Sequence, residues 1–210
     1  ISTNFNVNMM EAKVKPLIIL PEVESILYVT DSMGHEIPKV KYYVIPPVVL
    51  RLTGNNTIVR AMLKLFIVFY LGVFKRPDLL IGYGFVPHGI IVEAIGRLLN
   101  IPSCVNMIGG AIGIKGEDFT AEKDILIRFI KKKLGKIFLK VADKFKLIVA
   151  TGSSTKNFLV VKGGIKTEKI NIIPSMIDIN RFFPERNGYK YDLVTISQLI
   201  PTKKIDIFLE

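Results

Sequence analysis

The chain has 210 residues, half of them hydrophobic, which excludes an intrinsically disordered protein and indicates a packed core. Its formal net charge of +11 indicates an anionic partner such as a phosphorylated ligand, a membrane surface or nucleic acid. The single cysteine, Cys104, excludes an intrachain disulfide framework and a cysteine zinc site, and favours a reducing compartment. No signal peptide is recognised, and Ile1 to Thr3 is expected to be the tail of a first strand.

Apolar runs alternate with helical patterns along the chain. Continuous Val, Ile and Leu runs predict strands covered on both faces at residues 25–30, 42–45, 78–81, 103–108, 147–150 and 170–173. Helical periodicity predicts helices at residues 9–20, 58–74, 88–99, 121–145 and 154–161. This alternation predicts an α/β fold, Rossmann-like, with a mainly parallel sheet and helices on both faces.

The most apolar stretch is AMLKLFIVFYLGVF, residues 61–74, which contains Lys64. A membrane-spanning helix needs about 20 apolar residues, so this shorter stretch predicts a buried or interfacial helix.

The domain pattern changes after residue 173. Pro174 and Pro184 disfavour a helix between them, so residues 174–188 are predicted to be an interdomain linker. The strand, turn and helix start in YDLVTISQLIPTKKIDIFLE predict that residues 189–210 begin a second, truncated domain. Residues 1–173 are then the first domain.

A basic helix is predicted within residues 121–145. Residues 122–146 hold nine basic and three acidic side chains, and apolar residues recur on the opposite face. This pattern favours docking to anionic lipid, although a solvated helix face would show it too. The lysines expected to face the membrane are Lys132, Lys136, Lys140 and Lys144. Nucleic acid is not the expected partner, because no nucleic-acid motif is present and lysine predominates on this helix.

The linker resembles that of glycosyltransferase family 4, the retaining nucleotide-sugar enzymes with two facing Rossmann-like domains. The matching residues are Ile173, Pro174, Ile177, Asp178, Arg181, Phe182 and Pro184, with Ser175 and Met176 in place of the family's Asn-Gly. The turn after the next strand also follows the family's order, with Ser197, Gln198, Leu199, Pro201, Lys203 and Asp206. Softer, collinear matches are RPDLLIGYGFVPHG at residues 76–89, GRLLNIPSCVNMIGG at 96–110 and LIVATGSSTKNFL at 147–159.

The resemblance implies donor-binding residues in the second domain. Lys203 occupies the family's lysine position, where it would stabilise charge on the departing diphosphate without an obligatory metal or other cofactor. Gln198 stands where the family has arginine, so Lys204 is expected to share diphosphate binding. A solvated surface role for Lys203 stays open.

The resemblance also implies ligand contacts in the first domain. His88, in a strand-to-helix loop, would meet the acceptor and exchange a proton with it, unless it is a capping or packing histidine. Gly109 and Gly110 would allow close backbone approach to a ligand, or form a simple turn.

The resemblance therefore implies that the parent protein is a retaining glycosyltransferase. It would move sugar from a nucleoside diphosphate sugar to a glycan or lipid-linked acceptor, on the cytoplasmic, inner face of the cell membrane. The truncated chain alone would be inactive. The alternatives are a non-catalytic membrane-docking or partner-binding module of transferase ancestry, and a sugar-nucleotide epimerase of similar two-domain form.

Overall fold

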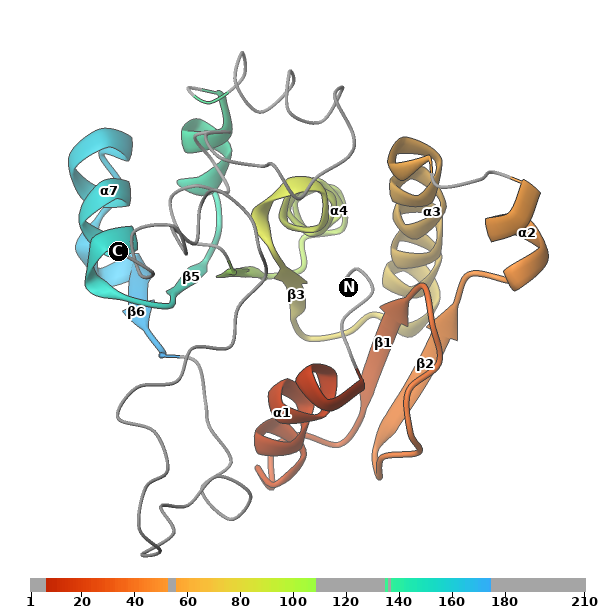
Figure 1. The fold of residues 1–210 in the computed structure, drawn as a ribbon. Helices are drawn as coiled ribbons and strands as arrows, with labels where there is room; N and C mark the ends of the chain where they lie inside the picture. Colours follow the sequence, from red (N-terminus) through yellow and green to blue (C-terminus); the bar gives the residue numbers. More distant parts are fainter. Residues whose placement is uncertain (1–6, 53–55, 109–134, 136, 175–210) are drawn as a thin grey trace, which may run out of the picture.

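Two parallel sheets organise the molecule (Figure 1). The structure, a computed structural model, describes residues 7–52, 56–108, 135 and 137–174. The larger sheet has the order β3 (Leu80–Tyr83), β4 (Ser103–Met107), β5 (Leu147–Ala150) and β6 (Ile170–Ile172). The smaller sheet pairs β1 (Ile26–Thr30) with β2 (Val40–Val44), and every pairing in both sheets is parallel.

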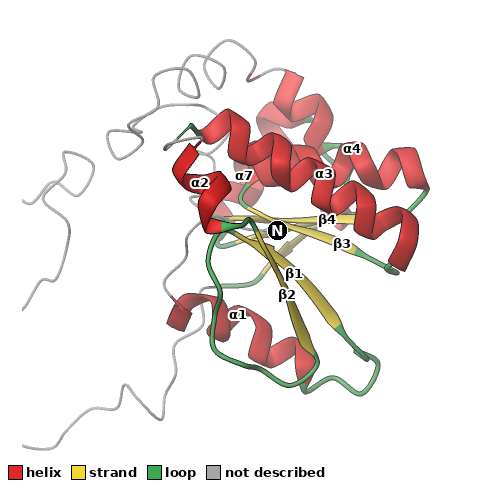
Figure 2. Ribbon diagram, turned by 90° about the vertical axis from the view of Figure 1, so that its right-hand side faces the viewer, coloured by secondary structure: helices red, strands yellow, loops and turns green. Residues whose placement is uncertain are grey.

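Helices cover both sides of this arrangement. In Figure 2, α3 and α4 lie on one side of the strands and α1 on the other. The helices are α1 (Val7–Ile18), α2 (Pro47–Leu52), α3 (Thr57–Lys75), α4 (Ile90–Leu99) and α7 (Ser153–Gly163). Single turns at Phe85–Gly89 and Thr167–Lys169 precede α4 and β6, and residues 137–142 are also helical. The predicted α/β fold with parallel strands and flanking helices is confirmed.

The strands are found where the apolar runs predict them, with shifts at their ends. β5 has the predicted bounds, whereas β3 begins two residues later than expected, at Leu80. Leu80 is the first residue of β3 that has a partner in β4, Ser103, so the pairing register sets the start of the strand. Apolar character predicted the strand correctly but did not specify which residues have a paired neighbour.

Two helical predictions need correction. α2 was not predicted, although Pro47 at its first position is a known helix-start signal, since that position needs no backbone N–H. The helix expected over residues 121–145 ends at residue 142, so Lys144 lies in the turn that follows it. The part of this segment at residues 121–134 lies outside the described residues.

The main hydrophobic core is formed by the larger sheet and the helices that pack against it. Val105, Ile148 and Ala150, from the two central strands, are completely buried. The ring of Phe85 packs edge-on against Phe138, with 5.8 Å between ring centroids. This continuous packing explains why most residues of the two central strands are apolar.

A cavity of about 730 Å³ lies between the two sheets, where β1 and β3 do not pair with each other. It is lined by residues of both strands, by α1 on one side and by α3 on the other. Asp31, Lys64 and His88, described below, do not line it.

Candidate functional site

The turn after β3 holds His88 beneath the protein surface. Gly84 begins the turn with a positive φ of 84°, and Gly89 N–H donates to its carbonyl at 3.0 Å. The turn folds closely onto β3, because a Cβ on Gly82 would lie 2.9 Å from the Gly89 Cα. The glycines thus allow His88 to be placed inside the protein, where it is 3% exposed.

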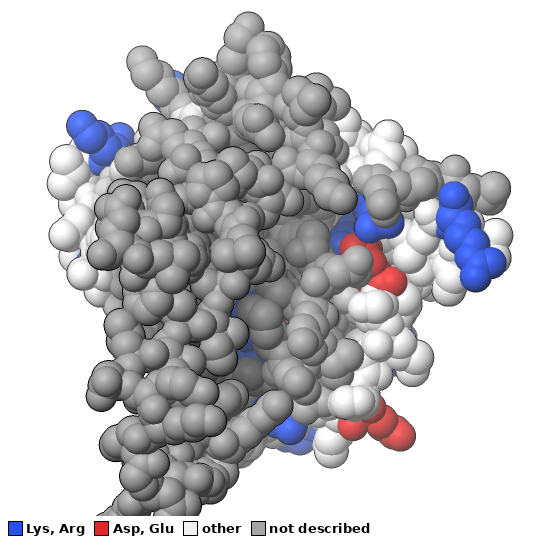
Figure 3. All heavy atoms as spheres, in the orientation of Figure 1, with Lys and Arg blue, Asp and Glu red and all other residues white. Residues whose placement is uncertain are grey.

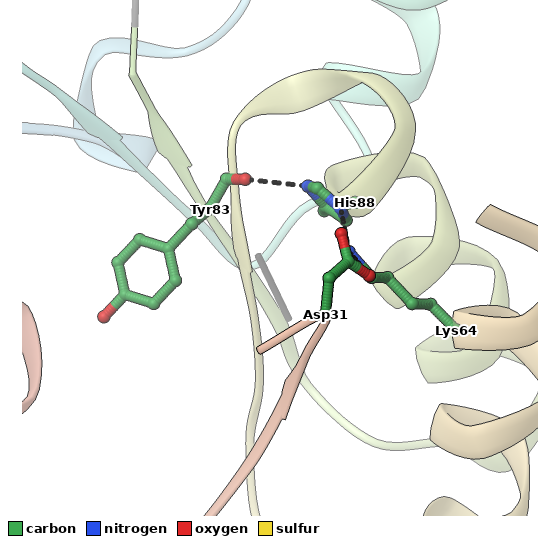
Figure 4. A network of polar contacts seen from close by, with 4 residues as sticks. All are labelled: Asp31, Lys64, Tyr83 and His88. Carbon is green, nitrogen blue, oxygen red and sulfur yellow. Dashed lines mark hydrogen bonds and ion pairs between the residues drawn. The ribbon is translucent and has the colours of Figure 1, made fainter. Parts of the chain in front are cut away.

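A buried ion pair lies beside this histidine (Figure 4). Asp31 directly follows β1, and its Oδ1 lies 2.9 Å from Nζ of Lys64 on α3. The two side chains are 4% and 2% exposed, and Lys64 Nζ is also 3.5 Å from His88 Nε2. The cluster therefore joins the carboxyl end of β1, the middle of α3 and the turn after β3.

The hydrogen bonds assign the histidine tautomer. His88 Nδ1 lies 3.1 Å from the carbonyl oxygen of Tyr83, which can only accept, so Nδ1 carries the proton. In the neutral ring Nε2 is then an acceptor, and the ammonium of Lys64 donates to it. Figure 4 shows the imidazole between Tyr83 and Lys64, while the Tyr83 ring points away from the cluster.

Burial and charge both keep the imidazole neutral. Desolvation, followed by the positive charge of Lys64, lowers the pKa of His88 to about 3. Burial also lowers the pKa of Lys64, and the neighbouring Asp31 carboxylate opposes that shift. The geometry supports a charged Asp31–Lys64 pair beside a neutral histidine.

This arrangement has one clear chemical property: it is a buried polar network in which Lys64 contacts both Asp31 and His88. Both nitrogens of His88 have partners, so proton exchange with a ligand would first require Lys64 to move away from Nε2. The cluster lies where the carboxyl ends of β1 and β3 converge, the edge at which α/β proteins commonly bind ligands.

The other predicted site residues are placed as follows. Lys140 and Lys144 are exposed, whereas Lys132 and Lys136 lie outside the described residues. Also outside are Gly109, Gly110, Gln198, Lys203 and Lys204, together with the linker from residue 175 and the second domain. Within the described ranges no group of three His, Cys, Asp or Glu side chains could hold a metal ion.

Two members of the cluster, Asp31 and Lys64, were missed as functional candidates. Lys64 is the lone charged residue of the apolar stretch at residues 61–74, and a fully buried lysine requires an anionic partner. Asp31 comes directly after the apolar strand ILYVT, at a position suited to supply that partner. These two signals were present, but their pairing depends on which strand packs against which helix.

The comparisons with known proteins assign no family. No protein-family model matches the chain, and no curated protein sequence matches it significantly. The proposals that follow therefore rest on the residues themselves and on the fold.

Proposed function

We propose that the chain is the acceptor-side domain, with the start of the donor-binding domain, of a retaining glycosyltransferase resembling family 4. The parent protein transfers a sugar from a nucleoside diphosphate sugar to a glycan or lipid-linked acceptor. The reaction takes place at the cytoplasmic face of the membrane, without nucleic acid as a partner and without an obligatory metal.

One observation gives the proposal its main support. Three of the segments that carry the family resemblance, at residues 76–89, 96–110 and 147–159, contain the neighbouring parallel strands β3, β4 and β5. The carboxyl ends of these strands therefore lie along one edge of the sheet, where ligands bind in α/β folds. His88 lies in the turn after the first of these strands. The resemblance assigns this residue to acceptor contact, and the same residue belongs to the buried cluster.

Lys203 offers the most direct test of the transferase proposal. The full-length polypeptide is incubated with UDP, GDP or ADP sugars and with glycan or lipid-linked acceptors, and product formation and anomeric configuration are measured. We expect sugar transfer with retained configuration in the presence of a chelator. Lys203→Gln should lower kcat about 10²- to 10³-fold, because one charge-stabilising donor is removed.

The matched control is Lys166→Gln, which changes an exposed lysine in the first domain and should leave kcat unchanged. Equal activity of Lys203→Gln and the wild type would contradict the diphosphate role of Lys203. Release of free nucleotide without any glycosylated acceptor would instead support the epimerase.

A non-catalytic docking module is the second candidate. The observation in its favour is the burial of His88, whose Nε2 faces Lys64 and not a solvent-accessible site. This candidate predicts no turnover of any donor by the full-length protein, combined with retained binding to membranes.

A further inference from the structure

α3 has an unusual apolar face directed away from the core. Its exposed side chains fall within an arc of about 160° when successive residues are placed 100° apart. The most exposed are Phe74 at 68%, Phe66 at 61% and Tyr70 at 55%. The others on this face are Ile58, Met62, Phe69 and Val73. So many large apolar side chains gathered on one exposed helix face indicate an interaction surface, since scattered single residues are the normal case.

The opposite face of α3 is tied to the protein core. Val68 and Leu71 are buried, and a Cβ on Gly72 would lie 2.5 Å from Leu99 Cδ1 of α4. Lys64 on this face is paired with Asp31. By length and composition α3 could cross a membrane, but crossing would expose this packed side and separate the buried pair. Only the outer face of α3 is therefore available to contact a membrane.

The charges around the outer face favour an anionic partner. Thr57–Lys75 contains no Asp or Glu, so no acidic side chain of α3 would repel an anionic partner. In α2, the exposed Arg51 accompanies Val48, which is 65% exposed. Figure 2 views the molecule from this side, with α2 beside α3. Figure 3 shows basic side chains at the margin of the molecule where α2 and α3 lie in Figure 1.

We propose that the outer face of α3 docks the protein onto an anionic lipid bilayer, with the helix lying in the plane of the interface. Phe66, Tyr70 and Phe74 enter the region between headgroups and acyl chains, while Arg51 on the neighbouring α2 contacts lipid phosphates. A second copy of this chain is a poorer partner, because each copy has a net charge of +11. The proposal deepens the membrane part of the proposed function, and it does not depend on sugar transfer.

Tryptophan fluorescence provides a specific probe, because the chain has no tryptophan. Phe66→Trp is mixed with vesicles of phosphatidylcholine alone, or of phosphatidylcholine with phosphatidylglycerol. We expect a blue shift and quenching by brominated acyl chains only with the anionic vesicles, and weaker binding at high salt. Leu98→Trp, at a 70% exposed position on α4, is the matched control and should show neither change.

Vesicle co-sedimentation tests the surface itself. The triple variant Phe66→Gln, Tyr70→Gln, Phe74→Gln should lose more than about tenfold in partitioning, because three aromatic side chains no longer enter the bilayer interface. A control triple, Met33→Gln, Leu98→Gln, Val161→Gln, changes equally exposed residues elsewhere and should bind as the wild type does. Thermal unfolding checks that both variants are folded.

Several results would overturn the proposal. One is equal vesicle binding by the wild type and the α3 triple variant, and another is no wild-type binding to anionic vesicles. Loss of binding in Lys140→Gln, Lys144→Gln but not in the α3 variant would assign docking to the basic segment. A dimer that the α3 substitutions dissociate, without vesicle binding, would identify a second copy as the partner. Since donor turnover is not measured here, failure of this proposal leaves the transferase proposal separately testable.

Discussion

The two faces of α3 are built from similar residues but have different surroundings. Leu71 on the inner face is 4% exposed, whereas Met62 on the outer face is 47% exposed. The inner face also contains Lys64, the only charged residue of the apolar stretch at residues 61–74. Lys64 is more deeply buried than Leu71. Apolar character therefore does not by itself identify the core-facing side of a helix, because the exposed face of α3 is apolar as well.

Removal of the buried Lys64 charge should reduce stability more than any change on the outer face of α3. Lys64→Met leaves the Asp31 carboxylate buried without its ion-pair partner, which we expect to reduce the free energy of unfolding by about 3 to 5 kcal/mol. Urea denaturation measures the loss. In the double variant Asp31→Leu, Lys64→Met the buried charge is absent, so most of the stability should return. If both single and double variants were as stable as the wild type, the pair would have no role in joining β1 to α3.

Matched truncations on the two faces compare burial directly. Leu71→Ala removes buried methyl groups and should cost about 2 to 4 kcal/mol, because a cavity is left behind. Met62→Ala truncates an exposed side chain and should change stability by less than about 0.5 kcal/mol. Thermal and urea unfolding test both. Equal losses would mean that the outer face is covered in solution by another copy of the chain.

His88, which contacts Lys64 on the inner face of α3, should make stability depend on pH. His88 has a folded-state pKa of about 3, below its ordinary value of 6.5, so the unfolded state binds more protons between these values. Stability from this group is complete above about pH 6.5 and falls by up to about 1.4 kcal/mol per pH unit as pH decreases toward 3. Urea midpoints across this range measure the slope.

His88→Gln should flatten this slope, whereas His35→Gln, at the exposed second histidine, should leave it unchanged. A wild-type slope that persists in His88→Gln would assign the acid sensitivity to carboxylates instead.

The smallest effect on stability is expected at the N-cap of α3, Asn56. The Asn56 side chain accepts hydrogen bonds from Ile58 N–H at 3.0 Å and from Val59 N–H at 3.3 Å. Asn56→Ala should cost about 1 kcal/mol, and Asn56→Asp, which keeps a capping oxygen, should cost less. Thermal unfolding of the two variants tests this difference. An unchanged melting temperature in Asn56→Ala would show that tertiary packing alone determines where α3 begins.

Local patterns were sufficient to predict the main elements. The apolar run LIVA predicted the bounds of β5, and α7 ends at Gly164, whose positive φ of 64° is a conformation that favours glycine. Continuous apolar strands alternating with helices also indicated a parallel α/β fold, because strands covered on both faces contain few polar residues. These properties depend on neighbouring residues in the chain, so the sequence by itself determined them.

The tertiary structure decided what depends on distant partners. Asp31 and Lys64 are 33 positions apart, and only the packing of α3 against β1 brings their charges to 2.9 Å. That packing also leaves Phe66 and Phe74 exposed while Val68 and Leu71 are buried, although all four are apolar residues of one helix. Sequence periodicity cannot choose between the two faces when both are apolar. The packing of α3 against the sheet determines which face is buried, and it also places Lys64 against the buried His88.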